Sequence, residues 1–267
     1  TTQKTTQANI KRNPPDMTNV SLSRQLIQFI QRSPTPFHAT EEMKSRLSAA
    51  GFTELRESDR WQTQAGGRYF VTRNGSSIIA FTPGGADLSD SGLRMLGAHT
   101  DSPCLHVKPE PQMLVEGYYQ LGVAVYGGAL LNPWFDRDLS IAGRISYRNK
   151  AQQLANALVD FRQPVAVIPS LAIHLDREAN ESRSIDKQQH LPPVLMRAEG
   201  DTPQAFRELL LEQARSQHPD LGIEAVLDFE LSLYDCQPPA LVGLKQEFIA
   251  AARLDNLLSC FVGLQAL

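Results

Sequence analysis

The run His99-Thr100-Asp101 has residue types and spacing that could support metal chemistry. On an extended backbone, residues two apart point to the same side, so this imidazole and this carboxylate can touch. A carboxylate that holds one ring nitrogen of a histidine orients the other nitrogen toward a metal ion. A histidine at the end of a strand is also often simply hydrogen-bonded. The pattern therefore leaves a metal ligand and a structural histidine both open.

Asp255 is a second candidate, because it stands in Arg253-Leu254-Asp255-Asn256 within an otherwise apolar, helix-like run. A buried carboxylate without a partner is very costly. Asp255 must therefore reach solvent, pair with a cation or bind a metal ion. Arg253 is a neighbour in sequence, but adjacent residues of a helix do not face each other.

Three further groups of residues could take part in catalysis or metal binding, but each also has a structural explanation. The two carboxylates of Trp134-Phe135-Asp136-Arg137-Asp138 could bind metal or act as an acid/base pair, but a salt-bridged turn is favoured. His174 lies in an apolar, strand-like run, residues 171–175, where a core or interface role is typical. Ser102 beside His99 suggests a serine hydrolase, yet adjacent residues seldom form a triad and the following Pro103 restricts Ser102 to an extended backbone.

The absence of several motifs narrows the chemistry. The sequence contains no GxGxxG, GxxxxGK[ST], GxSxG or HExxH run. Dinucleotide-binding, P-loop, α/β-hydrolase and zincin interpretations therefore lose their sequence support. A hydrolytic nucleophile would have to be water or lie elsewhere.

The elements that must position these residues begin with two predicted helices, residues 22–30 and 39–51, from apolar residues at helical spacing. A hairpin is predicted next, with strands at 68–72 and 76–81 joined by Asn74-Gly75. Residues 92–98 are predicted to form a buried strand that ends at His99. A polar cluster after an apolar strand is a common site of chemistry in α/β proteins.

The pattern changes from about residue 108 to residue 243, where short β-prone segments alternate with Gly and Pro. Strands are predicted at 120–126, 139–147, 165–168 and 227–233, the last half-exposed, with one helix at 204–217. Residues 245–267 return to a helical, Ala/Leu-rich pattern. The middle therefore reads as a β-rich insertion between two parts of an α/β domain.

Composition excludes several classes of function. The 267 residues carry 26 basic and 29 acidic side chains, a net charge of -3. This balance gives no electrostatic field for nucleic acid or an anionic membrane, and no apolar run approaches the roughly 20 residues of a membrane span. Cys104, Cys236 and Cys260 have no disulfide or metal-ligand spacing, which favours a cytoplasmic protein. Residues 1–16 are polar and are expected to be an extension outside the fold.

Several motifs in the same order resemble the aspartyl aminopeptidase family of dinuclear zinc metallopeptidases. The matching stretches are Gly97-Ala98-His99-Thr100-Asp101-Ser102-Pro103 with Val107-Lys108-Pro109, Trp134-Phe135-Asp136-Arg137-Asp138-Leu139-Ser140, Ile168-Pro169-Ser170-Leu171-Ala172-Ile173-His174-Leu175, and Arg253-Leu254-Asp255-Asn256. Four motifs spread along the chain are far more specific than any one of them.

The resemblance implies a mixed-sheet α/β/α zinc-peptidase domain (17–107 and 244–267) interrupted by a β-rich oligomerisation domain (108–243). It implies a metalloaminopeptidase, a hydrolase that removes N-terminal Asp or Glu from peptides, with two zinc ions per complete site and assembly into a homo-oligomer built from dimers. His99 is implied to bind zinc, Asp101 to orient it and Asp255 to bridge the two ions. His174 is implied to help catalysis by holding substrate in a neighbouring subunit's site, or to be a metal ligand; both roles stay open.

The family's Glu-Glu pair, a further Asp and a late His all lie beyond the motif that contains Asp255, and this sequence ends twelve residues after it. Two ligands cannot hold two zinc ions. We therefore expect this chain to be an incomplete portion of such an enzyme, to bind zinc weakly and to be inactive alone. The alternatives are a non-catalytic oligomerisation or interaction protein derived from the fold and, less well supported, a structural zinc module using His99, Asp255 and cysteines. Lys108, Arg137 and Arg177 are candidates, by charge alone, to recognise an acidic substrate.

Overall fold

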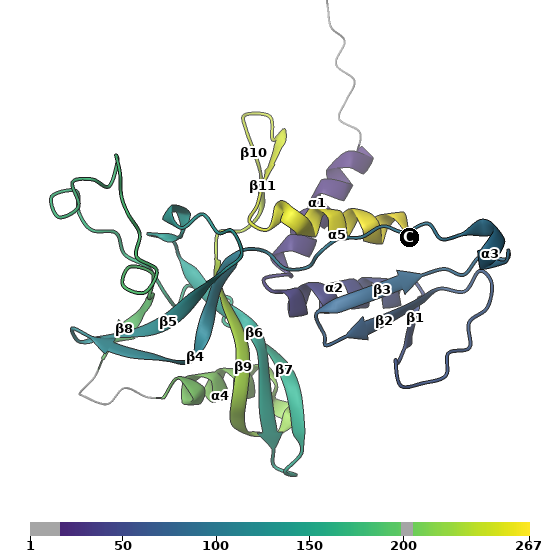
Figure 1. The fold of residues 1–267 in the computed structure, drawn as a ribbon, viewed down its shortest axis with the longest axis horizontal. Coiled ribbons are helices and arrows are strands. Elements are labelled where there is room, and N and C mark those ends of the chain that lie inside the picture. Colours follow the sequence, from purple (N-terminus) through teal and green to yellow (C-terminus); the bar gives the residue numbers. More distant parts are fainter. Residues whose placement is uncertain (1–16, 199–204) are drawn as a thin grey trace, which may run out of the picture.

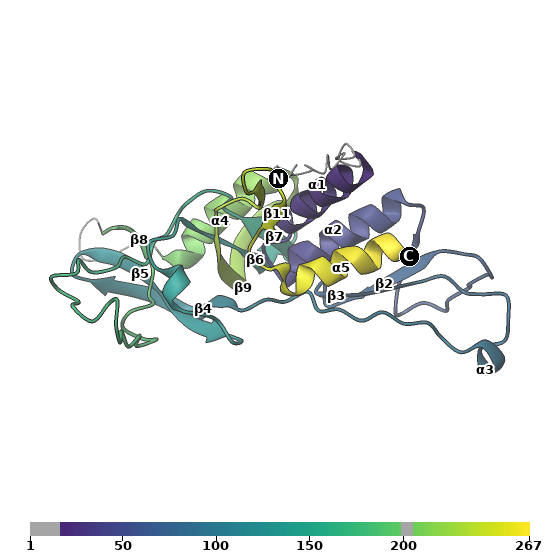
Figure 2. The same cartoon turned by 90° about the horizontal axis from the view of Figure 1, so that it is seen from above.

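A computed structural model describes residues 17–198 and 205–267, and the chain in it forms two lobes (Figures 1 and 2). In the described residues, the helical lobe contains four helices, one of them only four residues long, and a small sheet, and the sheet lobe contains a larger sheet with one α-helix. Residues 1–16, expected to be an extension, lie outside the described residues. The elements of the helical lobe are α1 (Met17–Gln31), α2 (Pro36–Ala49), β1 (Thr53–Leu55), β2 (Tyr69–Arg73), β3 (Ser77–Phe81), α3 (Leu88–Ser91) and α5 (Leu254–Ala266).

Both predicted N-terminal helices are confirmed, although α2 begins three residues before its predicted start. Thr35 has an extended backbone and its side chain accepts from the His38 amide, while Pro36 occupies the first turn. These are the residue types that start a helix. Gly51, with φ of 82°, follows the end of α2, where a left-handed residue commonly ends a helix.

The predicted hairpin is also confirmed. Strands β2 and β3 pair antiparallel, and Asn74 and Gly75 both have positive φ, 53° and 63°, as a two-residue turn of this kind requires. The sheet has the order β1-β2-β3. Ile78 packs against the helices whereas Ile79 is 66% exposed, so within the described residues the helices cover one face of this sheet.

The buried strand predicted at residues 92–98 is wrong. This segment is extended but pairs with no strand in the described residues, and Leu93, Met95 and Leu96 are 62–86% exposed. It runs beside α5 (Figures 1 and 2), where Leu96 approaches Gly263 so closely that a Cβ there would lie 2.7 Å from its Cδ2 atom. An apolar pattern indicates an extended backbone, but only a neighbouring strand turns that backbone into sheet.

The β-rich character of the middle region is confirmed by a six-stranded antiparallel sheet of order β7-β6-β9-β4-β5-β8. Phe206, Leu210 and Ala214 bury one side of α4 in its core. The elements are β4 (Cys104–Val115), β5 (Tyr118–Tyr126), η1 (Asn132–Trp134), β6 (Leu139–Asn149), β7 (Leu154–Asp160), β8 (Val194–Arg197), α4 (Phe206–Gln217), η2 (Pro219–Leu221), β9 (Ile223–Asp235), and the separate hairpin β10 (Ala240–Val242) and β11 (Phe248–Ala250).

Three predicted elements need correction or trimming in this region. Residues 165–168 make isolated bridges to neighbouring segments and form no strand. The helix predicted from residue 204 begins at Phe206, and residue 204 lies outside the described residues. The run from residue 245, predicted to be helical throughout, first pairs as β11 with β10 and becomes helical only at Leu254.

The half-exposed strand predicted at 227–233 is confirmed within β9. Phe229, Leu231 and Leu233 are buried, whereas Leu227 is 44% exposed. The pairing of β6 with β9 shifts by one residue between Asp228 and Val226. A bulge of this kind reverses which face the preceding residues occupy.

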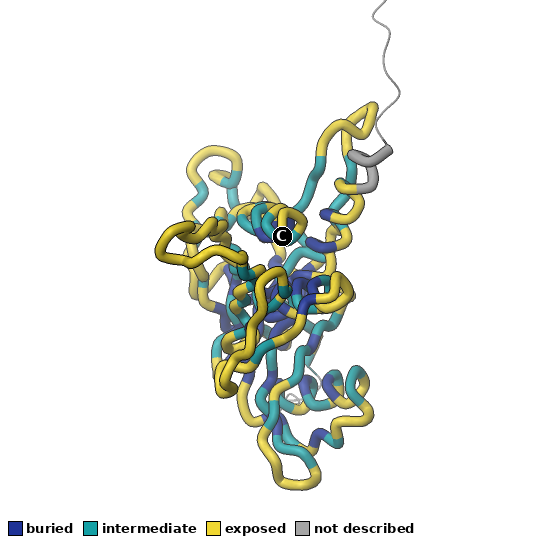
Figure 3. The backbone as a smooth tube through the Cα atoms, turned by 90° about the vertical axis from the view of Figure 1, so that its right-hand side faces the viewer, coloured by how far each residue is buried: buried dark blue, intermediate teal, exposed yellow. Residues whose placement is uncertain are grey.

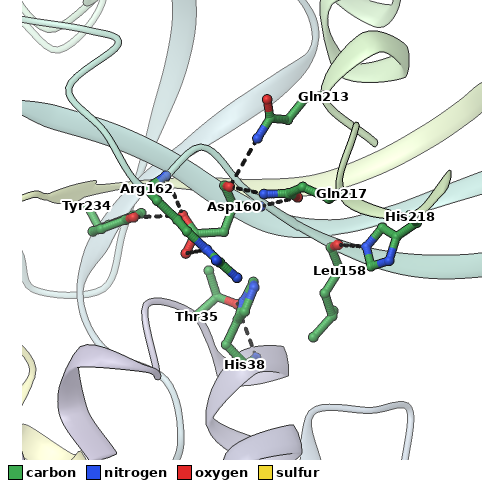
Figure 4. A network of polar contacts seen from close by, with 9 residues as sticks. All are labelled: Thr35, His38, Leu158, Asp160, Arg162, Gln213, Gln217, His218 and Tyr234. Atoms are coloured by element: carbon green, nitrogen blue, oxygen red, sulfur yellow. Dashed lines mark hydrogen bonds and ion pairs between the residues drawn. The ribbon is translucent and has the colours of Figure 1, made fainter. Parts of the chain in front are cut away.

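The two lobes meet where the start of α2 and the β2–β3 turn pack against the large sheet. The Arg144 guanidinium lies 4.4 Å from the centre of the Phe37 ring and donates to the Asn74 carbonyl at 2.7 Å. Figure 4 shows His38 and Thr35 on the side of the sheet lobe where Asp160 and Arg162 lie. Buried residues fill the interior of both lobes, and the long loops are exposed (Figure 3). No helix in the described part of the chain is long and apolar enough to cross a bilayer.

Candidate metal centre

His99 and Asp101 touch, as their spacing predicts. Nδ1 of His99 lies 3.2 Å from Oδ1 of Asp101 and 3.0 Å from the Asp101 carbonyl oxygen. Both contacts are acceptors, so the tautomer that satisfies them carries its proton on Nδ1. In that tautomer Nε2 carries the lone pair that can bind a metal ion.

Asp255 reaches the same imidazole from the other end of the chain. Its Oδ1 lies 3.2 Å from Nε2 of His99. The expectation that Asp255 sits inside a helix is wrong, because Asp255 and Asn256 have non-helical backbone angles and the Asp255 side chain is 88% exposed. The carboxylate therefore needs no buried cation and projects from an irregular turn at the start of α5.

Two hydrogen bonds hold these distant segments together. The Ser102 hydroxyl donates to the Asp255 carbonyl at 2.9 Å, and the Cys260 thiol donates to the His99 carbonyl at 3.2 Å. Because Ser102 bonds to a backbone carbonyl, its hydroxyl is not directed at the imidazole. The serine-hydrolase interpretation therefore gains no support.

The spacing of the two facing donors suits zinc. Ligand atoms about 2.0 Å from a tetrahedral zinc ion lie about 3.3 Å from one another. Nε2 of His99 and Oδ1 of Asp255 are 3.2 Å apart, and Asp101 supplies the carboxylate that such a histidine needs behind it. No group of three or more potential ligands occurs among the described residues, so the two facing donors are what this part of the chain brings together here.

The Asp101 carboxylate has a further partner that the sequence analysis missed. The Tyr126 hydroxyl, from the last residue of β5, donates to Oδ2 of Asp101 at 2.5 Å. This hydrogen bond is the main cause of a lowered pKa of Asp101, and it raises the pKa of Tyr126. The sequence signal was weak, since a tyrosine ending a strand before Gly127-Gly128 has many ordinary explanations.

His174 does not join this cluster within the described chain. The run 171–175, predicted to be strand-like, is an exposed turn in the long loop between β7 and β8, and Leu171, Ile173 and Leu175 are 47–75% exposed. No hydrogen bond, ion pair or metal-like group in the described residues joins His174 to His99, Asp101 or Asp255. A core role for His174 is therefore wrong.

The acidic cluster after Trp134 has the favoured structural role. The Asp136 carboxylate accepts from the Ser170 amide at 2.8 Å, which fixes the start of the loop that carries His174. Arg137 pairs with Asp235 at 3.2 Å and donates to Gln237 at 2.8 Å. These contacts tie the turn to β9 and its continuation.

A cavity of about 300 Å³ adjoins the candidate centre, and its lining includes Thr100, Ser102, Asp255 and Trp134. Arg253 also lines it, and burial lowers the pKa of this guanidinium. The guanidinium donates to the Ile30 carbonyl at 3.4 Å and lies 5.8 Å from the centre of the Tyr234 ring. A partly enclosed space therefore lies beside the two facing donors.

A mixed α/β fold that brings a carboxylate-oriented histidine against a second carboxylate is an arrangement typical of metal-dependent hydrolases. The chain belongs to the family of aminopeptidase I zinc metalloproteases (M18), whose model matches residues 29–267. This confirms the family predicted from the motifs, and with it zinc as the metal that the family uses.

Known proteins similar to the chain carry the same family name. The probable M18 family aminopeptidase 2 of Stutzerimonas stutzeri is 56% identical over 246 residues, 92% of this chain and 57% of that protein. The structure of Chaetomium thermophilum mApe1 matches with a TM-score of 0.80 at 35% identity, over 92% of this chain and 57% of the other. The S. cerevisiae mApe1 dodecamer matches with a TM-score of 0.74 at 29% identity, over 93% and 56%. The chain spans little more than half the length of these relatives.

Proposed function

We propose that this chain supplies the first part of the active site of a zinc-dependent aminopeptidase that removes N-terminal Asp or Glu from peptides. The observation that carries the proposal is the His99 imidazole held between two carboxylates, Asp101 at Nδ1 and Asp255 at Nε2, each at 3.2 Å. The family assignment supports the same chemistry.

In this proposal His99 and Asp255 hold zinc, and Asp101 keeps the imidazole oriented and its proton on Nδ1. In a complete site the exposed Asp255 carboxylate would be available to hold zinc. Zinc, when bound, lowers the pKa of a bound water and polarises the peptide carbonyl. The exposed Asp255 carboxylate lies at the rim of the adjoining cavity, where a peptide can approach it.

We infer that the chain alone binds zinc weakly and does not hydrolyse peptides, because zinc sites need three or four ligands and the described residues gather two. The test measures release of Asp from a peptide with N-terminal Asp, with and without chelator, next to zinc affinity by competition. We expect no release and an affinity lowered further by His99→Ala. Chelator-sensitive release of Asp would overturn the inference of inactivity.

We also propose that the loop around His174 contacts a second copy of the chain, where His174 holds substrate or binds metal in the partner's site. Three exposed apolar side chains beside it, Leu171, Ile173 and Leu175, suit a protein interface. A homo-oligomer is supported by the dodecamer described for a related structure, and its construction from dimers rests on the family resemblance alone. The division of the chain at 107/108 and 243/244, with the β-rich part as the oligomerisation domain, stays a prediction.

The interface is tested by sedimentation of the triple variant Leu171→Ser, Ile173→Ser and Leu175→Ser. We expect dissociation to smaller species, while Leu154→Ser, at a site 74% exposed on β7, should leave assembly unchanged. An unchanged oligomer in the triple variant would contradict the proposed contact. A non-catalytic oligomerisation protein is the second candidate function, favoured by the incomplete ligand set, and it predicts assembly without zinc binding.

The proposed selectivity for N-terminal acidic residues rests on the family resemblance. Of the three basic candidates, Lys108 and Arg137 already bind other side chains of this chain. Lys108 donates to Gln188 at 2.6 Å and Arg137 is paired with Asp235. We therefore propose that recognition of an acidic substrate side chain by this chain depends on Arg177 or on groups outside the chain.

A cytoplasmic location is proposed because Cys104, Cys236 and Cys260 are all free thiols.

A further inference from the structure

Tyr126 links the large sheet to the candidate metal centre. Its hydroxyl is 2.5 Å from Oδ2 of Asp101, whose Oδ1 is 3.2 Å from Nδ1 of His99. The three residues form a line in which each group contacts the next. Tyr126 belongs to β5, whereas His99 and Asp101 lie on the unpaired segment that precedes β4.

Neighbouring strands of the large sheet fix the position of the Tyr126 ring. Tyr126 pairs with Cys104 in β4, and the His106 ring packs edge-on against it at 4.9 Å between centres. Nδ1 of His106 is in turn 3.0 Å from the Ser232 hydroxyl of β9. Three adjacent strands therefore determine where the Tyr126 hydroxyl points.

Asp101 needs such a partner because little else restrains it. Its side chain is 42% exposed, and its own backbone carbonyl competes for Nδ1 of His99 at 3.0 Å. A carboxylate with one oxygen tied to a rigid hydroxyl keeps the other oxygen directed at the imidazole. Without that tie, the carboxylate can rotate into water and the imidazole can exchange tautomers.

We propose that Tyr126 is a positioning residue of the zinc site: its hydroxyl holds Asp101 so that His99 carries its proton on Nδ1 and presents Nε2 to the metal. The inference rests on the proposed function and deepens it. It also gives the β-rich region a part in the metal site besides assembly.

The test is Tyr126→Phe in the whole chain, which removes the hydroxyl and keeps the ring on His106. The tautomer is read from the ¹⁵N shifts of the metal-free His99 ring in an Asp255→Ala background, which removes the acceptor 3.2 Å from Nε2. There Tyr126→Phe should change a dominant Nδ1–H tautomer to a mixture of both. Zinc affinity should fall about 10-fold, as is typical when a group behind a metal ligand is lost. In Asp101→Asn the added Tyr126→Phe change should cost nothing further, since the two act through one contact.

Tyr118→Phe is the matched control, because it removes a hydroxyl eight residues away on β5, about 26 Å along the strand. It should leave both the tautomer and the affinity unchanged. A wild-type tautomer in Tyr126→Phe overturns the proposal. If wild-type zinc affinity does not respond to His99→Ala, the proposed function fails instead, and the metal-free tautomer still decides the role of Tyr126.

Discussion

His38 should make the junction between the two lobes sensitive to acid. Burial lowers the pKa of His38 from its ordinary 6.5 to about 4, with Asp160 acting in the opposite direction and Arg162 adding to the depression. Nδ1 of His38 also lies 2.8 Å from the Thr35 hydroxyl at the start of α2. The folded state therefore favours the neutral imidazole (Figure 4).

The sign and size follow from this depression. Above pH 6.5 His38 is neutral in the folded and unfolded chain, so its contribution is fully present. As the pH falls toward about 4, His38 binds a proton in the unfolded chain but stays neutral in the folded chain, so the free energy of unfolding decreases. Each pH unit between 6.5 and about 4 lowers the free energy of unfolding by about 1.4 kcal/mol, so the full loss is about 3 kcal/mol. Partial exposure of the ring reduces this loss to about 2 kcal/mol.

The assay is urea unfolding followed by circular dichroism between pH 7.5 and pH 4 for the wild type and His38→Gln. Carboxylates titrate in both proteins, so the difference between the two profiles isolates His38. We expect the wild type to lose about 2 kcal/mol more than the variant over this range. Parallel profiles for wild type and His38→Gln would refute the reasoning.

Three further substitutions test the fold. Gly143→Ala in β6 should destabilise the sheet lobe by about 3 kcal/mol in urea unfolding, because its Cβ would lie 2.0 Å from the Glu230 carbonyl oxygen; an unchanged midpoint would contradict the close packing. Phe261→Ala, 2% exposed in α5, should cost about 3–5 kcal/mol by the same measurement. Asp136→Ala should free the Ser170 amide and speed limited proteolysis of residues 170–190 severalfold, and equal cleavage rates would show that the carboxylate does not anchor this loop.

Local patterns predicted the elements whose causes are local. The α1 and α2 helices, the turn at Asn74 and Gly75, and the contact between His99 and Asp101 depend on spacing over a few residues. The helix α2 begins before its predicted start because the cap at Thr35 and the proline in the first turn determine where it begins, whereas apolar spacing indicates only its interior. The segment at 92–98 failed because a strand needs a partner, which no local pattern supplies.

The candidate site was predictable only in part for the same reason. Asp255 stands 156 positions after His99 in the sequence, and only the family resemblance connected the two before the structure placed them 3.2 Å apart. Neither the residue spacing nor the family resemblance indicated Tyr126. Its position follows from the pairing of β5 with β4 and from its packing against the ring of His106.

The division of labour between the lobes follows from where the donors originate. Asp255 reaches His99 from the turn that begins α5, and α5 is anchored in the helical core by Leu257, Cys260 and Phe261. The carboxylate that orients His99 is held from the other lobe through Tyr126. A shift of one lobe against the other would therefore change the distance from His99 to Asp255 or the hydrogen bond from Tyr126 to Asp101. The junction at His38, Asp160 and Arg144 accordingly supports the geometry of the metal centre as well as the stability of the fold.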